Sequence, residues 1–164
     1  MRQLSFIRDQ HGTAAVEFAL VLPVVIGLII GTMEVGLVAL VSNTLDNAVQ
    51  SAARAVRVNE TGAATTNAAF KTAICSGMFE AQATCLSKLS VSVRTFASFA
   101  AAQAAASDTP AAEFSKGVAG DIVLVKATYT WPFFMPFFTL GLQQSGPTNV
   151  LLDARTTFKN EPYS

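Results

Sequence analysis

The residues that could do chemistry by type and spacing lie in two stretches of this 164-residue chain. The first covers residues 11–18 and opens a long apolar run, in which Glu17 is the fifth residue counted from Thr13. A carboxylate near the edge of a membrane helix is costly and usually functional, so Glu17 is a candidate functional residue. The second stretch contains Cys75 and Cys85, two thiols that could form a covalent bond.

Catalytic patterns are otherwise missing from the sequence. The one histidine, His11, precedes the apolar run, so Ser–His and Cys–His pairs are not available beyond it. The chain has no Gly-rich phosphate loop, and its cysteines and carboxylates do not cluster with metal-ligand spacing. We therefore expect no enzyme, no cofactor and no metal.

Composition favours a membrane-associated protein with one domain of modest size. Apolar residues make up 51% of the chain and charged residues only 13%, which is unusual for a soluble enzyme. The 11 Lys and Arg balance the 11 Asp and Glu. With no basic surplus, we expect no nucleic-acid partner.

The apolar run predicts a transmembrane helix over residues 13–41, interrupted only by Glu17 and Glu34. This run of about 29 residues exceeds the roughly 20 that a bilayer core requires. Arg2 and Arg8 precede it, so the positive-inside rule places the N-terminus in the cytoplasm and the remaining chain outside. A cleavable signal peptide is an alternative, but its apolar region is usually only about 7–15 residues long. A plain signal anchor is another.

The helix is predicted to continue beyond the membrane over residues 42–58, because apolar residues recur there at steps of three and four. One helix from Ala14 to Val58 would be about 65 Å long at 1.5 Å per residue, and Thr61-Gly62 would stop it. The apolar positions of this extension are Leu45, Val49, Ala52, Ala53 and Val56.

The rest of the predicted extracytoplasmic domain, residues 42–164, is small and mixed. Alternating or β-branched runs predict three strands, and one further segment favours helix. The fold class we expect is α+β: a long N-terminal helix packed on a small antiparallel sheet of about three strands. The expected strands are residues 89–96, 121–131 and 149–159; a short helix is expected over residues 64–78, and residues 97–112 could be a helix or a loose loop.

Two features of this domain leave alternatives open. Cys75 and Cys85 form a disulfide if their compartment is oxidising, and are two buried thiols otherwise. Residues 131–138 are rich in Phe and contain two prolines, which bar a regular strand or helix. They could be a loop tucked into the core, or an exposed patch for a membrane surface or a partner.

Both ends of the chain resemble the TadE-like family of pseudopilins, or minor pilins, of the tight-adherence (Tad) type IVb pilus system. Residues 9–23 match the opening of that family closely, and residues 31–36 resemble its second Glu-bearing stretch. Its later pattern, a valine-rich strand leading to an aromatic-Pro region and a last strand ending in Glu-Pro, resembles Val123 to Phe138 and Asp153 to Pro162.

The resemblance implies a pilin-like fold and a processed precursor. A prepilin peptidase would cut after Gly12, removing a cytoplasmic leader of residues 1–12, and Glu17 would help the subunit enter a fibre. Thr13 departs from the more familiar Ala but is also small. The implied location is the inner membrane, with the domain in the periplasm.

The implied function is assembly or initiation of an adhesive pilus, with the peptidase, other pilins and pilus-assembly platform proteins as partners. Two other functions remain open at this point. The chain could be an uncleaved single-pass envelope protein, or a pseudopilin of a type II secretion-like machine.

Overall fold

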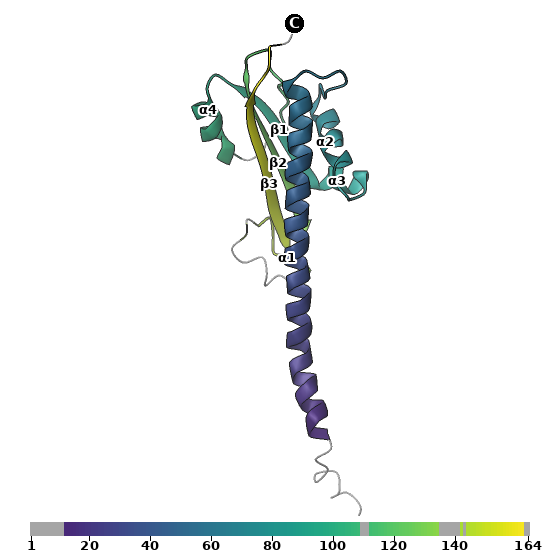
Figure 1. Ribbon diagram of the computed structural model, residues 1–164. Helices are drawn as coiled ribbons and strands as arrows, with labels where there is room; N and C mark the ends of the chain where they lie inside the picture. Colours follow the sequence, from purple (N-terminus) through teal and green to yellow (C-terminus); the bar gives the residue numbers. More distant parts are fainter. Residues whose placement is uncertain (1–11, 109–111, 135–141, 143, 163–164) are drawn as a thin grey trace, which may run out of the picture.

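The computed structural model describes residues 12–108, 112–134, 142 and 144–162. Helix α1 (Thr13–Arg57) is 45 residues long and forms the axis of the molecule (Figure 1). At 1.5 Å per residue, α1 extends about 67 Å. The predicted single long helix is therefore confirmed.

A hydrogen-bonded cap ends α1 before the predicted stop at residues 61–62. The N–H of Asn59 donates to the carbonyl of Val56 at 3.1 Å, and the N–H of Glu60 donates to that of Ala55 at 2.9 Å. Asn59 has φ +49°, a left-handed conformation that Asn tolerates better than most residues. This paired arrangement satisfies two of the last helix carbonyls and turns the chain away.

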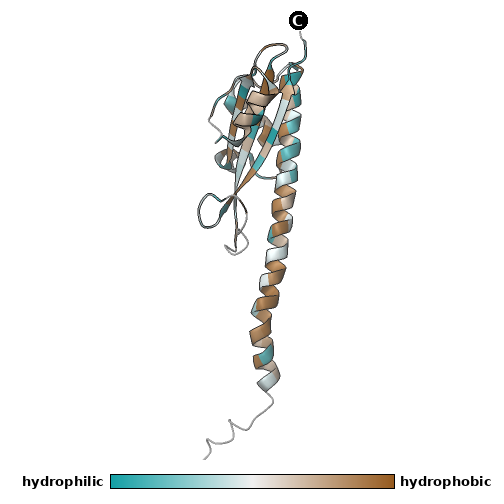
Figure 2. Ribbon diagram, turned by 90° about the vertical axis from the view of Figure 1, so that its left-hand side faces the viewer, coloured by the Kyte–Doolittle hydropathy of each residue, from teal (hydrophilic) through white to brown (hydrophobic). Residues whose placement is uncertain are grey.

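The two halves of α1 have different surroundings. Large apolar side chains from Val16 to Leu40 are exposed, and Figure 2 shows the N-terminal half as mainly hydrophobic. The buried residues of the C-terminal half recur at mainly three- and four-residue steps and therefore lie on one face of the helix. The folded domain packs on this face. In the C-terminal half the buried residues are Val41, Leu45, Ala48, Val49, Ala52, Ala53 and Val56, and Gly31 and Glu34 are buried just before it.

The domain contains a three-stranded antiparallel sheet in the order β1 (Leu89–Phe96), β2 (Ile122–Pro132), β3 (Asn149–Lys159). All three predicted strands are confirmed, and the α+β fold class with them. Alternate residues of each strand face α1 and form the core. The main ones are Leu89, Val91, Val93, Val123, Val125, Ala127, Tyr129, Val150, Leu152 and Ala154.

Short helices cover both faces of the sheet. Helix α2 (Asn67–Ser76) lies against α1 and β1, and α3 (Gln82–Lys88) leads directly into β1. Helix α4 (Phe99–Ala104) continues into the 3-10 turn η3 (Ala105–Ser107), and both lie toward the other face of the sheet (Figure 1). Residues 97–112, for which a helix or a loop was open, are thus partly helical.

Candidate functional site

Gly12, the residue before the predicted cleavage point, is the exposed N-cap of α1. Its φ of −89° is one that other residues adopt freely. Apart from its chain neighbours and the backbone of its own helix, a Cβ built on Gly12 would meet no described atom within 4 Å. Among the described residues, neither backbone conformation nor packing requires glycine here. A requirement for glycine would therefore come from another molecule.

Glu17 lies on the exposed apolar half of α1, four residues beyond Thr13 and on the same face of the helix. Its neighbours Val16 and Phe18 are 60% and 64% exposed. The Glu17 carboxylate has no hydrogen bond or ion pair to any residue that the structure describes. The carboxylate is exposed at the surface of the helix.

Glu34, the second carboxylate of α1, lies where the folded domain begins to cover the helix. It is only 5% exposed, and its Oε1 accepts a hydrogen bond from the backbone N–H of Phe134. Phe134 follows β2 closely, so this bond joins α1 to the β2–β3 connection. The sequence shows Glu34 as an interruption of the apolar run and as part of the second family stretch, but it does not indicate a partner for this carboxylate.

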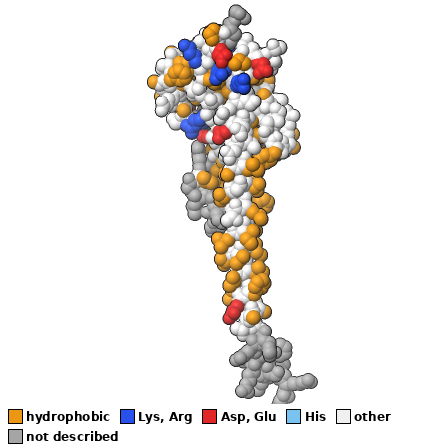
Figure 3. Space-filling view, viewed as in Figure 1, with side chains coloured by type: hydrophobic (Ala, Val, Ile, Leu, Met, Phe, Trp, Pro, Cys, Tyr) orange, Lys and Arg blue, Asp and Glu red, His pale blue; other side chains and the backbone are white. Residues whose placement is uncertain are grey.

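The exposed half of α1 provides a continuous apolar surface between these two carboxylates. Within the described residues, α1 is the one helix long and apolar enough to cross a membrane. Figure 3 shows hydrophobic side chains over much of this half, whereas the Lys and Arg side chains in that view lie on the domain. This distribution fits a helix anchored in a membrane beside a water-exposed domain.

The predicted disulfide is present between Cys75, in α2, and Cys85, in α3, with Cα atoms 5.8 Å apart. Next to it, Glu80 accepts hydrogen bonds from Lys88, at 2.6 Å, and from the hydroxyl of Tyr129. Burial raises the pKa of Glu80, but the bonds from Lys88 and Tyr129 and the Lys88 charge outweigh it, so that the pKa is lowered. Burial and Glu80 raise the pKa of Tyr129. The cluster ties the disulfide loop to β2.

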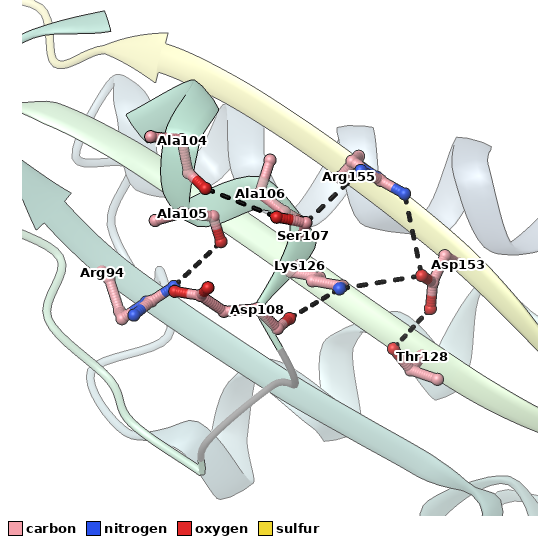
Figure 4. A network of polar contacts seen from close by, with 10 residues as sticks. All are labelled: Arg94, Ala104, Ala105, Ala106, Ser107, Asp108, Lys126, Thr128, Asp153 and Arg155. Carbon is pink, nitrogen blue, oxygen red and sulfur yellow. Dashed lines mark hydrogen bonds and ion pairs between the residues drawn. The ribbon is translucent and has the colours of Figure 1, made fainter. Parts of the chain in front are cut away.

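A second polar cluster crosses the sheet face that points away from α1 (Figure 4). Lys126 is 7% exposed, and its Nζ donates to the backbone carbonyl of Asp108 at 2.7 Å and lies 3.7 Å from Asp153. Thr128 donates to the same carboxylate at 2.6 Å, and Arg94 pairs with Asp108 at 3.2 Å. These bonds hold the end of the α4–η3 segment on the sheet, so we assign the cluster a structural role.

The predicted site residues therefore form two separate groups. Gly12, Thr13 and Glu17 share the N-terminal end of α1, whereas Cys75 and Cys85 lie in the domain. A groove of about 440 Å³ between α1 and β3 is lined by seven residues, including Arg54 and Arg57, and no carboxylate is among them. Among the described residues, no three His, Cys, Asp or Glu side chains could share a metal ion.

Comparison with known proteins locates the resemblance on α1. The family model described as TadE-like protein matches residues 12–54. No curated protein and no solved structure matches the chain. The predicted resemblance is confirmed for this segment, which begins at Gly12 and contains Glu17 and Glu34. The resemblance predicted for residues 123–138 and 153–162 lies outside the match and stays a prediction.

Proposed function

We propose that this chain, whose family match supports a pilin-like protein associated with a Tad pilus, is a minor pilin that acts in assembly or initiation of that adhesive pilus. The observation that carries the proposal is the organisation of α1. One continuous helix has a candidate cleavage point and a carboxylate at one end, an exposed apolar half, and a folded domain on the other half. Such a subunit can leave a membrane and stack by its helix without refolding its domain.

The proposed location is the inner membrane, with the N-terminus in the cytoplasm and the domain in the periplasm. From Thr13 to Met33, α1 is about 30 Å long, which matches the roughly 30 Å of a bilayer hydrocarbon core. Arg2 and Arg8 at the N-terminal side favour this orientation. The Cys75–Cys85 disulfide is consistent with the oxidising periplasm.

In this proposal, a prepilin peptidase cuts between Gly12 and Thr13 and leaves an amine on Thr13. The exposed carboxylate of Glu17 on a neighbouring subunit pairs with that amine as the helices stack. Pairing would relieve two charges in an apolar environment, where an unpaired charge costs up to about 3 kcal/mol on insertion scales. Other pilins and the pilus-assembly platform are the proposed partners.

Processing is tested by co-expressing the full chain with its prepilin peptidase and sequencing the N-terminus of the membrane-purified product. The expected product begins at Thr13. Gly12→Leu should remain uncut, and it should fold normally, because no described atom lies near a Cβ at this position. If the wild-type chain stays uncut while a known prepilin is cut in the same cells, the chain is an uncleaved membrane anchor.

A further inference from the structure

Phe134 is the most exposed large hydrophobic residue that the structure describes, at 93%. Its neighbour Phe133 is 5% exposed and belongs to the core. The two residues after β2 therefore face in opposite directions: one anchors the segment in the domain, and the other projects from it. A single exposed Phe needs no explanation by itself, so its position along α1 decides what it could contact.

The hydrogen bond to Glu34 fixes the position of Phe134 along α1. Glu34 is 21 residues beyond Thr13, which is about 32 Å along the helix axis and matches the thickness of a bilayer core. The exposed apolar surface of α1 continues past this point, because Val35, Leu37 and Leu40 are 55%, 45% and 50% exposed. Leu40 lies about 9 Å beyond Glu34 along the axis. Phe134 therefore lies beside the apolar band of α1, not beyond its end.

The backbone around Phe134 is compatible with that position. The N–H of Phe133 donates to the carbonyl of Thr148 at 2.7 Å, and the N–H of Phe134 donates to Glu34. In or near lipid, an amide without an acceptor costs several kcal/mol, so irregular backbone is tolerated only where the protein supplies acceptors. Both amides have acceptors within the protein. The Phe134 ring can therefore move from water into lipid without leaving a backbone N–H unpaired.

We propose that Phe134 inserts into the interfacial layer of the same bilayer that α1 spans, on the domain side, so that lipid holds the base of the domain against the membrane. The proposal rests on the proposed transmembrane position of α1. The shared apolar band, the fixed position at Glu34 and the exposed ring favour lipid as the occupant. Interfacial helices bury their apolar faces about 5–10 Å into the headgroup boundary, a depth that a projecting Phe ring can also reach.

The test uses full-length protein in phosphatidylcholine vesicles that contain lipids brominated at defined acyl-chain depths, which quench Trp fluorescence by contact. In a Trp131→Phe background, a single Trp is placed by Phe134→Trp, Leu28→Trp or Phe99→Trp. Leu28 is 61% exposed on the apolar half of α1. Phe99 is 53% exposed and comes three residues after the last residue of β1, at the end of the sheet where β2 begins and β3 ends.

We expect Trp at 134 to lose emission to bromines near the headgroups and to shift to shorter wavelength than Trp at 99, which should not be quenched. Trp at 28 should be quenched most by deep bromines. Quenching at 28 without quenching at 134 would overturn the proposal and leave the span intact. Absence of quenching at 28 would overturn both the span and the anchor.

A second measurement keeps the native Trp131, which contacts the core, in case its replacement disturbs folding. The photoreactive residue benzoylphenylalanine is placed at position 134 or, as control, at position 99, and the vesicles are irradiated. The expected result is a mass increase of one lipid at position 134 alone. A crosslinked dimer in place of the lipid adduct would identify a second copy of the chain as the occupant and overturn the proposal.

Discussion

The carboxylate of Glu34 accepts a hydrogen bond from the backbone N–H of Phe134, which lies 100 residues later in the chain. This bond joins the point where α1 enters the domain to the connection after β2. Glu34 is 5% exposed, whereas Phe134 is 93% exposed, so the bond is partly buried. We therefore expect the bond to contribute to the attachment of the base of the domain to the helix.

Replacing Glu34 tests this attachment. Glu34→Leu removes the acceptor and leaves the Phe134 amide unpaired, which we expect to cost about 1–3 kcal/mol of folding free energy. Glu34→Gln keeps a side-chain oxygen and should cost less. Hydrogen exchange of the Phe134 amide in detergent micelles measures the effect, with faster exchange expected in Glu34→Leu only. Equal protection in both variants and the wild type would show that the bond does not hold the segment.

The Cys75–Cys85 disulfide should contribute measurably to stability. It closes a loop with a sequence separation of 10, which corresponds to about 2–3 kcal/mol in the chain-entropy model. Cys75→Ala/Cys85→Ala should lower the unfolding midpoint accordingly, without blocking membrane insertion. Intact mass without reductant should be two hydrogen atoms below the reduced mass. Two freely alkylated thiols in protein isolated from the envelope would contradict this prediction.

The Glu80 cluster predicts a pH-dependent stability. Because the folded-state pKa of Glu80 lies below the ordinary value of 4.5, its ionised form stabilises the fold above pH 4.5. That contribution is lost as the pH falls through the lowered pKa. Thermal unfolding of the wild type and Glu80→Gln from pH 7 to pH 3 should therefore give a difference that is largest at neutral pH and shrinks in acid.

A matched control for this cluster is Glu161→Gln. Glu161 pairs with Arg57 at 3.1 Å, but both side chains are about half exposed, so the pair should contribute no more than about 1 kcal/mol. Its removal should change the unfolding curve little at any pH. If Glu80→Gln changes the unfolding midpoint no more than Glu161→Gln does, the ionised Glu80 does not stabilise the fold.

The regular elements could be predicted because their signals are local. The strands Leu89–Phe96 and Asn149–Lys159 form at the predicted bounds, since alternating side chains suit a sheet with one covered face. Helix α3 was not predicted, because its seven residues are too few to show a helical period. The helix α1 ends before the predicted stop at Gly62, because Asn59 adopts the left-handed conformation first. Asn is a weaker sequence signal for this conformation than Gly.

The residues of the candidate site also differ in whether the neighbouring sequence reveals them. Glu17 could be predicted from its own neighbours, since a charge in an apolar run is visible in the sequence alone. The contact between Glu34 and Phe134 could not, because it depends on how the sheet packs on α1. The expectation that no regular strand forms over residues 131–138 is wrong for Trp131 and Pro132, which end β2 and pair with β3. Beyond β2, both open alternatives are partly correct, because Phe133 is in the core and Phe134 is exposed. Residues 135–138 lie outside the described part of the chain.

Glu17→Leu tests the proposed assembly role directly. The substitution removes a costly charge from the apolar half of α1, so the variant should insert in the membrane at least as well as the wild type. Its domain should fold normally, because Glu17 contacts no described part of it. Processing after Gly12 should continue, or nearly so. The expected defect is confined to assembly, because the amine of Thr13 on the neighbouring subunit then lacks its partner.

Crosslinking to pilin components and surface piliation of a complemented deletion strain measure this defect. Glu17→Gln keeps the shape without the charge and should fail as Glu17→Leu does, whereas Val16→Leu, on an adjacent exposed position, should assemble normally. If Glu17→Gln assembles and Glu17→Leu does not, hydrogen bonding rather than charge joins the subunits. A residue that only anchors the helix can be replaced by leucine without loss. Normal crosslinks and normal pili in Glu17→Leu would therefore show that Glu17 is an interfacial carboxylate with no part in assembly.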